Sequence, residues 1–449
     1  MRSTLSWRGA RHIRSCLLLV LCSLGAARSS RAEQVIVQKG NVEIYTDGRG
    51  SGFVSYVNAD GLPRSTSTRT VLTDGFALRG DEENEINADG TYPQGHIEGV
   101  RVRSGFVGNV LGFGARMKAD EHTFTAYIQI WAWIESELHR KGELQFADVR
   151  QGYAKVEGFW GSALAGRTRC LFSRGATDID ADYAHRWGVG FTGNVDSRGP
   201  SLGQIGFGVL GSGFCAGVIY ATPVLAGFQL SAGLFDPLQL AGSWTRTKLL
   251  RPEGELTFQL PFGKLGKVGA FVNGTTQQVY KRDAHASTNA WGFGAGARLE
   301  LGPMRLGGAM HYGVGLGMRY ALEPGDATVG SGDRLRTFDG YYGQLMAVLD
   351  PIPVDIFAGA GISRAYRLER QGNFAADGEP RSPEDMAPPS VPRSEMGINA
   401  GVVWHIKPWL HFDVDAFRAH FRWYGITTET RPGDEQIAYI VNSGMTIAW

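Results

Sequence analysis

The sequence has few cysteines, no excess of charge of either sign and no long apolar run beyond its N-terminus. Its 45 basic and 44 acidic residues give a formal charge of +1, which excludes the basic surface of a nucleic-acid-binding protein. It contains no His-Glu-x-x-His, Gly-x-Ser-x-Gly or P-loop motif. We therefore expect no enzyme, no catalytic residue, no metal site and no cofactor.

Charge is also missing from residues 199–235, which raises the question of a membrane-spanning helix. Several glycines and Pro223 interrupt this stretch, and apolar residues alternate with polar ones after Gly227. Proline and glycine in these positions oppose a helix. We expect two strands joined by residues 223–227.

The N-terminus has the form of a signal peptide. Four arginines precede a short apolar core, residues 16–27, which is too short to cross a bilayer as a helix. Small residues at Ser30 and Ala32 place the expected cleavage after Ala32. Residues 1–32 are therefore expected to be removed from an exported protein, and residues 33–449 to form a single domain.

Alternation of apolar and polar residues is the strongest pattern present. In residues 123–138, Phe124, Ala126 and Ile128 fall on one side of a strand and Tyr127 and Gln129 on the other. The same period of two recurs in residues 306–318, 396–406 and at the C-terminus. The apolar faces are long enough for a tilted strand to cross a bilayer.

The connections between these strands alternate in length. Tight turns, such as those near Gly158, Gly302 and Pro408, alternate with the long polar stretches 59–97, 171–202, 237–250, 322–335 and 371–393. Short periplasmic turns and long external loops are typical of an outer-membrane barrel. We predict an all-β, transmembrane antiparallel β-barrel of about 16 strands, with 18 possible. A change of face partway along the strands 99–118 and 409–424 predicts a β-bulge near Gly108 and another near Ala416.

Several segments resemble the general porins of Gram-negative bacteria, in the order in which that family has them. Arg150-Gln-Gly-Tyr-Ala154 and Leu164-Ala-Gly-Arg167 resemble its fourth and fifth strands, and Tyr220-Ala-Thr-Pro223 resembles the hairpin that follows its pore loop. The aromatic C-terminal residue, Trp449, is similar to the signal for the barrel-assembly machinery, although porins usually end in Phe. Residues 165–180 are weakly similar to sugar-selective porins, which have eighteen strands.

The resemblance implies that the third external loop, residues 171–203, folds into the barrel and narrows it. The charged residues of this constriction loop are Arg174, Asp178, Asp180, Asp182, His185 and Arg186. A basic wall facing the loop is expected from Arg101, Arg103, Arg116, Arg150, Arg167 and Arg169. Arginines and carboxylates on opposite sides of a constriction set up a transverse field. Each arginine could equally be a solvated lumen residue, and the three aspartates could instead bind Ca²⁺.

The remaining cysteines and the tryptophans leave alternatives open. Cys170 and Cys215 could form a disulfide in an oxidising compartment, but the alternation places one outward and the other inward, which opposes the bond. Alternation places Trp131 and Trp133 inside, where they could form an aromatic surface for sugar rings, whereas a bulge would turn them into an aromatic girdle. We favour the girdle or plain packing. Trp404, Trp409 and Trp449 are predicted girdle residues beside the periplasmic turns.

The resulting prediction is a porin that lets small hydrophilic solutes and ions diffuse passively through a water-filled channel. The alternative is a solute-specific channel for sugars or for anions such as phosphate. The expected partners are membrane lipids and lipopolysaccharide, the barrel-assembly machinery and, by the resemblance, two further copies in a homotrimer.

Overall fold

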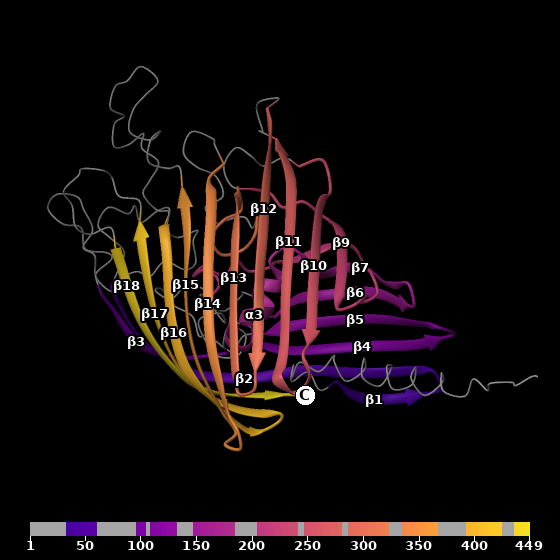
Figure 1. The fold of residues 1–449 in the computed structure, drawn as a ribbon, viewed down its shortest axis with the longest axis horizontal. Coiled ribbons are helices and arrows are strands. Elements are labelled where there is room, and N and C mark those ends of the chain that lie inside the picture. Colours follow the sequence, from indigo (N-terminus) through magenta and orange to yellow (C-terminus); the bar gives the residue numbers. More distant parts are fainter. Residues whose placement is uncertain are drawn as a thin grey trace, which may run out of the picture.

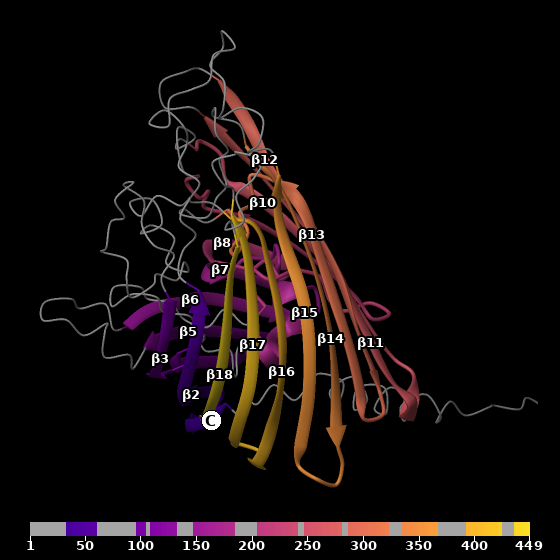
Figure 2. The ribbon, with the colours of Figure 1, turned by 90° about the vertical axis from the view of Figure 1, so that its left-hand side faces the viewer.

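A ring of antiparallel strands forms the protein. The computed structural model describes residues 33–60, 96–104, 108–132, 147–184, 204–240, 247–280, 286–322, 335–366, 392–423 and 435–449. Eighteen strands belong to one sheet, and each wall strand pairs with the next along the chain. The ring closes where β18 pairs with β2, and Figure 2 shows these two strands side by side. No backbone edge is left open between the first and the last wall strand, as a bilayer requires.

Two of the eighteen strands are additional to the wall, which leaves sixteen in the ring (Figure 1). β1 (Gln34–Lys39) pairs with the start of β2, and β3 (His96–Arg103) shares one place in the wall with β4. The wall strands are β2 (Val42–Asp60), β4 (Asn109–Ala119), β5 (His122–Ala132), β6 (Ala147–Gly158), β7 (Gly161–Arg169), β8 (Phe214–Ala221), β9 (Phe228–Phe235), β10 (Arg251–Pro261), β11 (Gly266–Tyr280), β12 (Ser287–Leu301), β13 (Met304–Val314), β14 (Thr337–Leu349), β15 (Val354–Tyr366), β16 (Pro392–Lys407), β17 (Leu410–Trp423) and β18 (Glu435–Ala448).

The predicted two faces are present on these strands. On β5, Phe124 and Ile128 are 43% and 44% exposed on the outer side, whereas Tyr127 and Gln129 are 8% and 2% exposed on the inner side. Successive side chains of a strand point to opposite faces, so an apolar outer surface and a polar inner one follow from the sequence pattern. The predicted all-β barrel of sixteen strands is confirmed.

One rim of the barrel carries the short turns that were predicted. They include residues 120–121, 159–160, 302–303, 350–353 and 408–409, and β10 and β11 are joined by the short 3-10 helix η2 (Gly263–Leu265). Most of the expected external loops, and the expected signal peptide, lie outside the described residues. No helix in the described part of the chain is long and apolar enough to cross a bilayer.

Two predicted details of the strands are wrong. β17 runs without a bulge at Ala416, because Phe417, Ala419 and Phe421 continue the inner face. These residues are apolar because they pack inside the barrel, so the sequence alternation looks the same as it would if the strand changed face. The alternation in residues 306–318 predicted a strand that continues past Val314, but β13 ends there. The predicted irregularity near Gly108 corresponds to the interruption between β3 and β4.

Candidate functional site: the barrel interior

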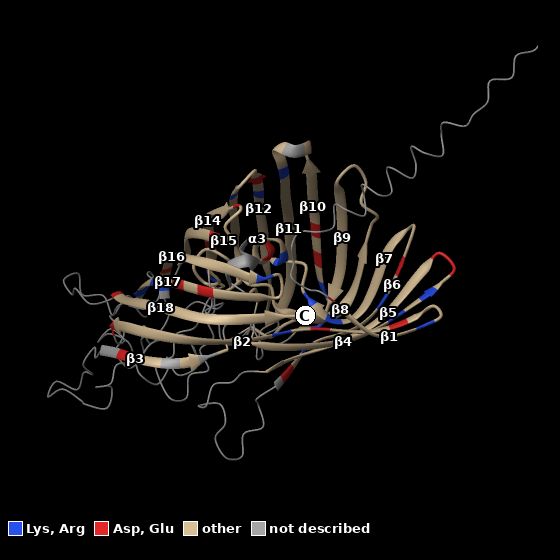
Figure 3. Ribbon diagram, turned by 90° about the horizontal axis from the view of Figure 1, so that it is seen from below, with Lys and Arg blue, Asp and Glu red and all other residues tan. Residues whose placement is uncertain are grey.

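The main feature of the interior is an in-folded segment between β7 and β8. It contains the helix α3 (Arg174–Ala184), which lies within the ring of strands in Figure 3. The helix packs against β11, β12 and β13. An in-folded segment was predicted at this place, whereas its helical form was not.

A disulfide between Cys170 and Cys215 closes this segment at its base. The two Cα atoms are 5.3 Å apart, and Cys215 lies opposite Thr168 on the neighbouring strand. The expectation that the two cysteines point to opposite faces is therefore wrong. The error lies in the face assigned to β7, where small residues give little indication of which side is apolar.

The observed orientation of β7 also changes the side of the wall on which Arg167 lies. Thr168 Oγ1 donates a hydrogen bond to Gln151 Oε1 at 3.1 Å, so Thr168 is on the inner face. Arg167 lies in the outer row, because it pairs with Gly152, which lies opposite the outward-facing Ile128. A slip of one residue reverses every side chain of a strand. Arg167 therefore does not belong to the predicted basic wall.

Inner residues of β10 hold the start of the segment. Glu253 Oε2 accepts a hydrogen bond from the backbone N–H of Phe172 at 2.8 Å, and its Oε1 lies 3.0 Å from Arg251 Nε. Arg251 Nη2 in turn lies 2.8 Å from the sulfur of Cys215. Arg174, which was predicted to face the pore, instead forms an ion pair with Glu255. Carboxylates of β10 and the disulfide thus fix the same end of the segment.

Glycines in the wall let α3 approach closely. A Cβ added at Gly296 or Gly307 would lie 2.9 Å or 2.8 Å from the side chain of Ile179. Gln344 Nε2 also donates a hydrogen bond to the Ile179 carbonyl at 3.0 Å. The glycine-rich inner faces of β12 and β13 therefore serve to seat the helix, a role that the sequence pattern alone did not indicate.

The predicted acidic residues of the loop fall on the helix. Asp178 Oδ1 forms an ion pair with Arg169 Nη1 at 2.6 Å and is 54% exposed. Asp180 and Asp182 lie on α3, but their side chains, like His185 and Arg186, are outside the described residues. Residues i and i+2 of a helix point in different directions. The alternative of a Ca²⁺ site made by all three aspartates is therefore not supported by the local geometry.

Charged groups of the opposite wall lie in pairs. Arg116 contacts Glu43 at 3.0 Å and Glu33 at 2.8 Å, and its guanidinium lies 4.6 Å from the ring centre of Tyr45. Lys155 contacts Glu157 at 2.6 Å. This wall therefore mixes both signs of charge, which a search for arginines alone missed.

Arg150 and Trp131 form a second cluster on this wall. Arg150 contacts Asp148 at 2.9 Å and lies 5.1 Å from the ring centre of Trp131. Trp131 donates a hydrogen bond to Gln129 Oε1 at 2.9 Å. Of the two alternatives favoured for Trp131, the girdle is wrong and plain packing is what the structure shows, with the ring centre of Phe214 5.3 Å away, while Trp133 lies outside the described residues. Arg101 and Arg103 are on β3 opposite Ser55 and Phe53, and their side chains are not among those described.

A second in-folded segment was not predicted. After Val314 the chain leaves the wall at Gly315, which has a φ of 70°, and residues 315–322 lie inside. Arg319 Nη2 contacts Glu395 Oε1 at 2.8 Å, and both side chains are almost fully buried. The glycine-rich end of the predicted strand was the available signal, since glycine permits this backbone turn.

Residues 204–211 pack beside this second segment. Phe207 lies between Phe417 and Phe421, with ring centres 5.1 Å and 5.6 Å away. The interior along β14–β18 is therefore filled with side chains.

The predicted girdle residues lie at one end of the barrel. Trp404 and Trp409 are outward and half exposed, next to the turn between β16 and β17. Trp449 follows β18 at the same end, where its backbone N–H and carbonyl each bond to Gly48.

The described residues contain no group of three or more His, Cys, Asp or Glu side chains arranged to hold a metal ion. The interior is thus made of paired charges, hydrogen-bonded amides and aromatic rings.

Comparisons with known proteins bear on the fold. No protein-family model and no curated protein sequence matches the chain. Among solved structures, the outer-membrane channel DcaP of Acinetobacter baumannii is similar with a TM-score of 0.58 and 11% identity, over 92% of this chain and 99% of that one.

Two further structures are similar to a comparable degree. Salmonella typhi OmpF in complex with daunomycin gives a TM-score of 0.54 and 10% identity, over 92% and 99% of the two chains. The anion-selective porin from Comamonas acidovorans gives 0.53 and 12%, over 91% and 100%. This chain therefore has the sixteen-stranded barrel fold of the outer-membrane porins.

Proposed function

We propose that this protein is an outer-membrane porin through which small hydrophilic solutes and ions diffuse passively. The observation that carries the proposal is the contrast between the two faces of the wall. Outer side chains are apolar, whereas charged inner side chains on β2 and β4–β7 remain hydrated. Charges are tolerated at these positions because water in a lumen solvates them.

The exposure of the charged groups locates the proposed water path. Glu43, Arg116, Arg150, Lys155 and Asp178, on β2, β4, β6 and α3, are between 24% and 54% exposed, whereas Asp47 on β2 is buried. Glu395, Asp413 and Asp415 on β16 and β17 are 1% to 5% exposed. The path therefore runs between α3 and the wall formed by β2 and β4–β7.

The constriction follows from this path. Among the described side chains, Asp178 of α3 would face Arg116 and Arg150 across the path, while Arg169 joins the two sides through its contact with Asp178. The charges of Asp180, Asp182, His185, Arg186, Arg101 and Arg103, which lie outside the described side chains, are proposed to add to this constriction. Arg167 takes no part.

Reversal potentials under a salt gradient test this arrangement. Arg116→Gln should shift the channel towards cations and Asp178→Asn towards anions. A unit charge a few ångströms from an ion in water is worth about 1 kcal/mol, so permeability ratios should change by up to about fivefold. Arg167→Gln removes the same charge from the outer face and serves as the matched control. The assignment fails if Arg167→Gln shifts the potential as much as Arg116→Gln does.

A solute-specific channel, for sugars or for anions such as phosphate, is the second candidate. The arginines along the proposed path favour it, and one structure of the same fold is of an anion-selective porin. Saturable block of the ion current by phosphate or by an oligosaccharide would distinguish it from a general channel.

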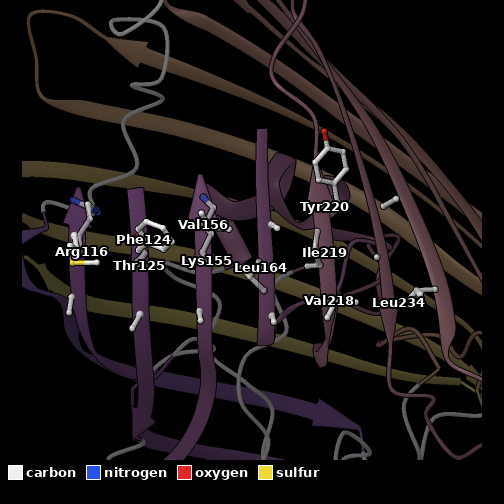
Figure 4. Close-up of a pocket in the computed structure, with 18 of the residues that line it drawn as sticks. Arg116, Phe124, Thr125, Lys155, Val156, Leu164, Val218, Ile219, Tyr220 and Leu234 are labelled. Atoms are coloured by element: carbon white, nitrogen blue, oxygen red, sulfur yellow. The ribbon is translucent and has the colours of Figure 1, made fainter. Parts of the chain in front are cut away.

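We further propose that the protein assembles as a homotrimer through its shorter side. β8 and β9 have only 8 residues each, and β7 has 9, whereas a tilted strand needs about 9–11 to cross the hydrocarbon layer. Their outer face, with that of β4–β6, forms an open apolar groove of about 1070 Å³, where Phe124, Tyr220 and Leu234 surround several alanines (Figure 4). A neighbouring copy would cover a wall that lipid covers poorly.

The size of the particle in detergent tests this assembly. The purified protein should have the mass of three chains, and Ala154→Trp, which fills the groove with an apolar side chain, should yield single chains. Ile398→Trp places the same side chain on the outer face of β16 and should leave the trimer intact. A wild-type protein that is monomeric at all concentrations would contradict the proposal.

The remaining partners belong to the same proposal. The taller outer faces would contact membrane lipids and lipopolysaccharide. The strand ending in Trp449 would be recognised by the barrel-assembly machinery in the outer membrane, after export directed by residues 1–32.

A further inference from the structure

The outer face of β17 changes from apolar to charged partway along the strand. Going up from the short turn at its start, the outward side chains Phe412, Val414 and Ala416 are apolar and exposed. The next side chain on this face is Arg418, since every second residue of a strand points the same way. Arg418 is therefore the first charged group above the apolar part of the strand.

The height of Arg418 places it near one boundary of the membrane. Trp409, at the short-turn end, precedes Leu410, the first residue of β17, and the strand ends at Trp423 on the opposite side. At about 3.4 Å per residue and a tilt near 40°, Arg418 lies roughly 20 Å above Leu410, close to the top of an apolar band about 25 Å tall. A long arginine side chain carries its charge from such a position to the headgroup layer.

The charge of Arg418 is not balanced by the protein. Among the described residues its guanidinium contacts an aromatic ring, whose centre is 5.9 Å away, and no carboxylate. Two other outer arginines on this side of the barrel are neutralised, because Arg364 forms two bonds of 2.8 Å to Asp339 and Arg422 contacts Glu435 at 3.0 Å. A charge at the edge of hydrocarbon needs a counter-ion, so the partner of Arg418 has to come from outside the chain.

The neighbours of Arg418 fit an amphipathic partner. Ile398 of β16 and Tyr439 of β18 lie opposite it, and Asn58 of β2 lies opposite Tyr439, so these four residues form one outer row across four adjacent strands. Figure 2 shows these strands side by side. Ile398 and Tyr439 are 41% and 52% exposed. The row thus offers a cation, a phenol and an amide directly above an apolar surface.

We propose that Arg418 binds a phosphate of lipid A, the membrane anchor of lipopolysaccharide, in the outer leaflet. A guanidinium matches a phosphate with two parallel N–H bonds, and basic sites on membrane proteins bind anionic headgroups. The acyl chains would cover Val414 and Val441 below the row, while Tyr439 and Asn58 would bond to sugar hydroxyls. The site rests on the proposed outer-membrane function, whose contact with lipopolysaccharide it assigns to particular residues.

Binding of lipid A to the purified full-length barrel tests the proposal. The protein is refolded in detergent free of lipopolysaccharide and titrated with purified lipid A, and bound molecules are counted by native mass spectrometry. We expect saturable binding that is weakened about tenfold in Arg418→Gln, because charge-assisted bonds to the phosphate are lost. Lys407→Gln removes the same charge from an exposed position at the short-turn end and should bind as the wild type does.

Other ligands and a second variant identify the group that is bound. Lipid A without its phosphates should bind the wild type as weakly as lipid A binds Arg418→Gln. Phosphatidylglycerol should bind more weakly than lipid A, and inorganic phosphate should not displace lipid A. Arg418→Lys keeps the charge without the planar fork, so its affinity should lie between those of the wild type and Arg418→Gln.

Three results would overturn the proposal. Equal affinity of the wild type and Arg418→Gln would remove the site. Phosphatidylglycerol that binds as tightly as lipid A, with the same loss in Arg418→Gln, would assign the site to phospholipid, and displacement by inorganic phosphate would assign it to a dissolved anion.

The outcome is separate from that of the channel proposal. A barrel that conducts ions but binds lipid A equally with and without Arg418 contradicts the lipid site alone. An ion-tight barrel that binds lipid A through Arg418 contradicts the channel alone.

Discussion

Replacing Cys170 and Cys215 together by serine should lower the free energy of unfolding by about 4 kcal/mol. The bond joins residues 45 positions apart, and a loop of this length loses about that much chain entropy when it is closed in the unfolded state. The segment it closes contains α3, so the current through the proposed channel should also fluctuate more. Urea unfolding in lipid vesicles and single-channel recording measure the two effects.

Reduction of the wild type provides the control for this prediction. A thiol reductant should reproduce the noise of the double variant in the wild-type channel and leave the variant unchanged. Equal noise and equal stability in the oxidised and reduced wild type would show that the bond does not hold the segment.

Breaking the buried pair on β10 should have an effect of similar size. Glu253→Gln leaves the guanidinium of Arg251, which is 1% exposed, without its carboxylate. Removing one partner of a buried ion pair typically costs 3 to 5 kcal/mol. The same change weakens the hydrogen bond from the Phe172 N–H, so the base of the in-folded segment loses a second attachment.

The double variant Arg251→Met and Glu253→Gln separates the two contributions. It leaves no unpaired charge, so most of the stability should return, as measured by urea unfolding in vesicles. Lys155→Met with Glu157→Gln removes a half-exposed pair from the opposite wall and should cost less than about 1 kcal/mol. A loss in Glu253→Gln no larger than in this control would contradict the assigned role of the pair.

The sequence was sufficient to predict the barrel because each strand faces lipid on one side and the barrel interior on the other. Lipid requires an apolar residue at every second position, so β5 and β16 could be assigned to a face residue by residue. The closing of the ring followed from the same physics, since a free sheet edge in hydrocarbon is too costly. The number of wall strands and the rim with short turns were predicted correctly for this reason.

The interior was predicted less well, because it is packed like a protein core in some places and is wet in others. Phe417 and Phe421 face inward against Phe207, which the rule of a polar lumen does not anticipate. On β7, alanines face outward and Leu164 faces inward, so the inner and outer faces of this strand were interchanged in the prediction. The same error placed Arg167 in the lumen and opposed the disulfide. Residues 315–318 were expected to continue the strand because their alternation continues after the wall ends.

The most direct test is the ion current through the purified protein in planar lipid bilayers. We expect stable ohmic conductance steps. In Asp178→Cys, a charged, bulky thiol reagent should reduce them, whereas the same reagent on Leu265→Cys, in the exposed turn between β10 and β11, should leave them unchanged. A membrane that stays ion-tight, or a current that responds to the label at Leu265→Cys and not at Asp178→Cys, would contradict a water path alongside α3.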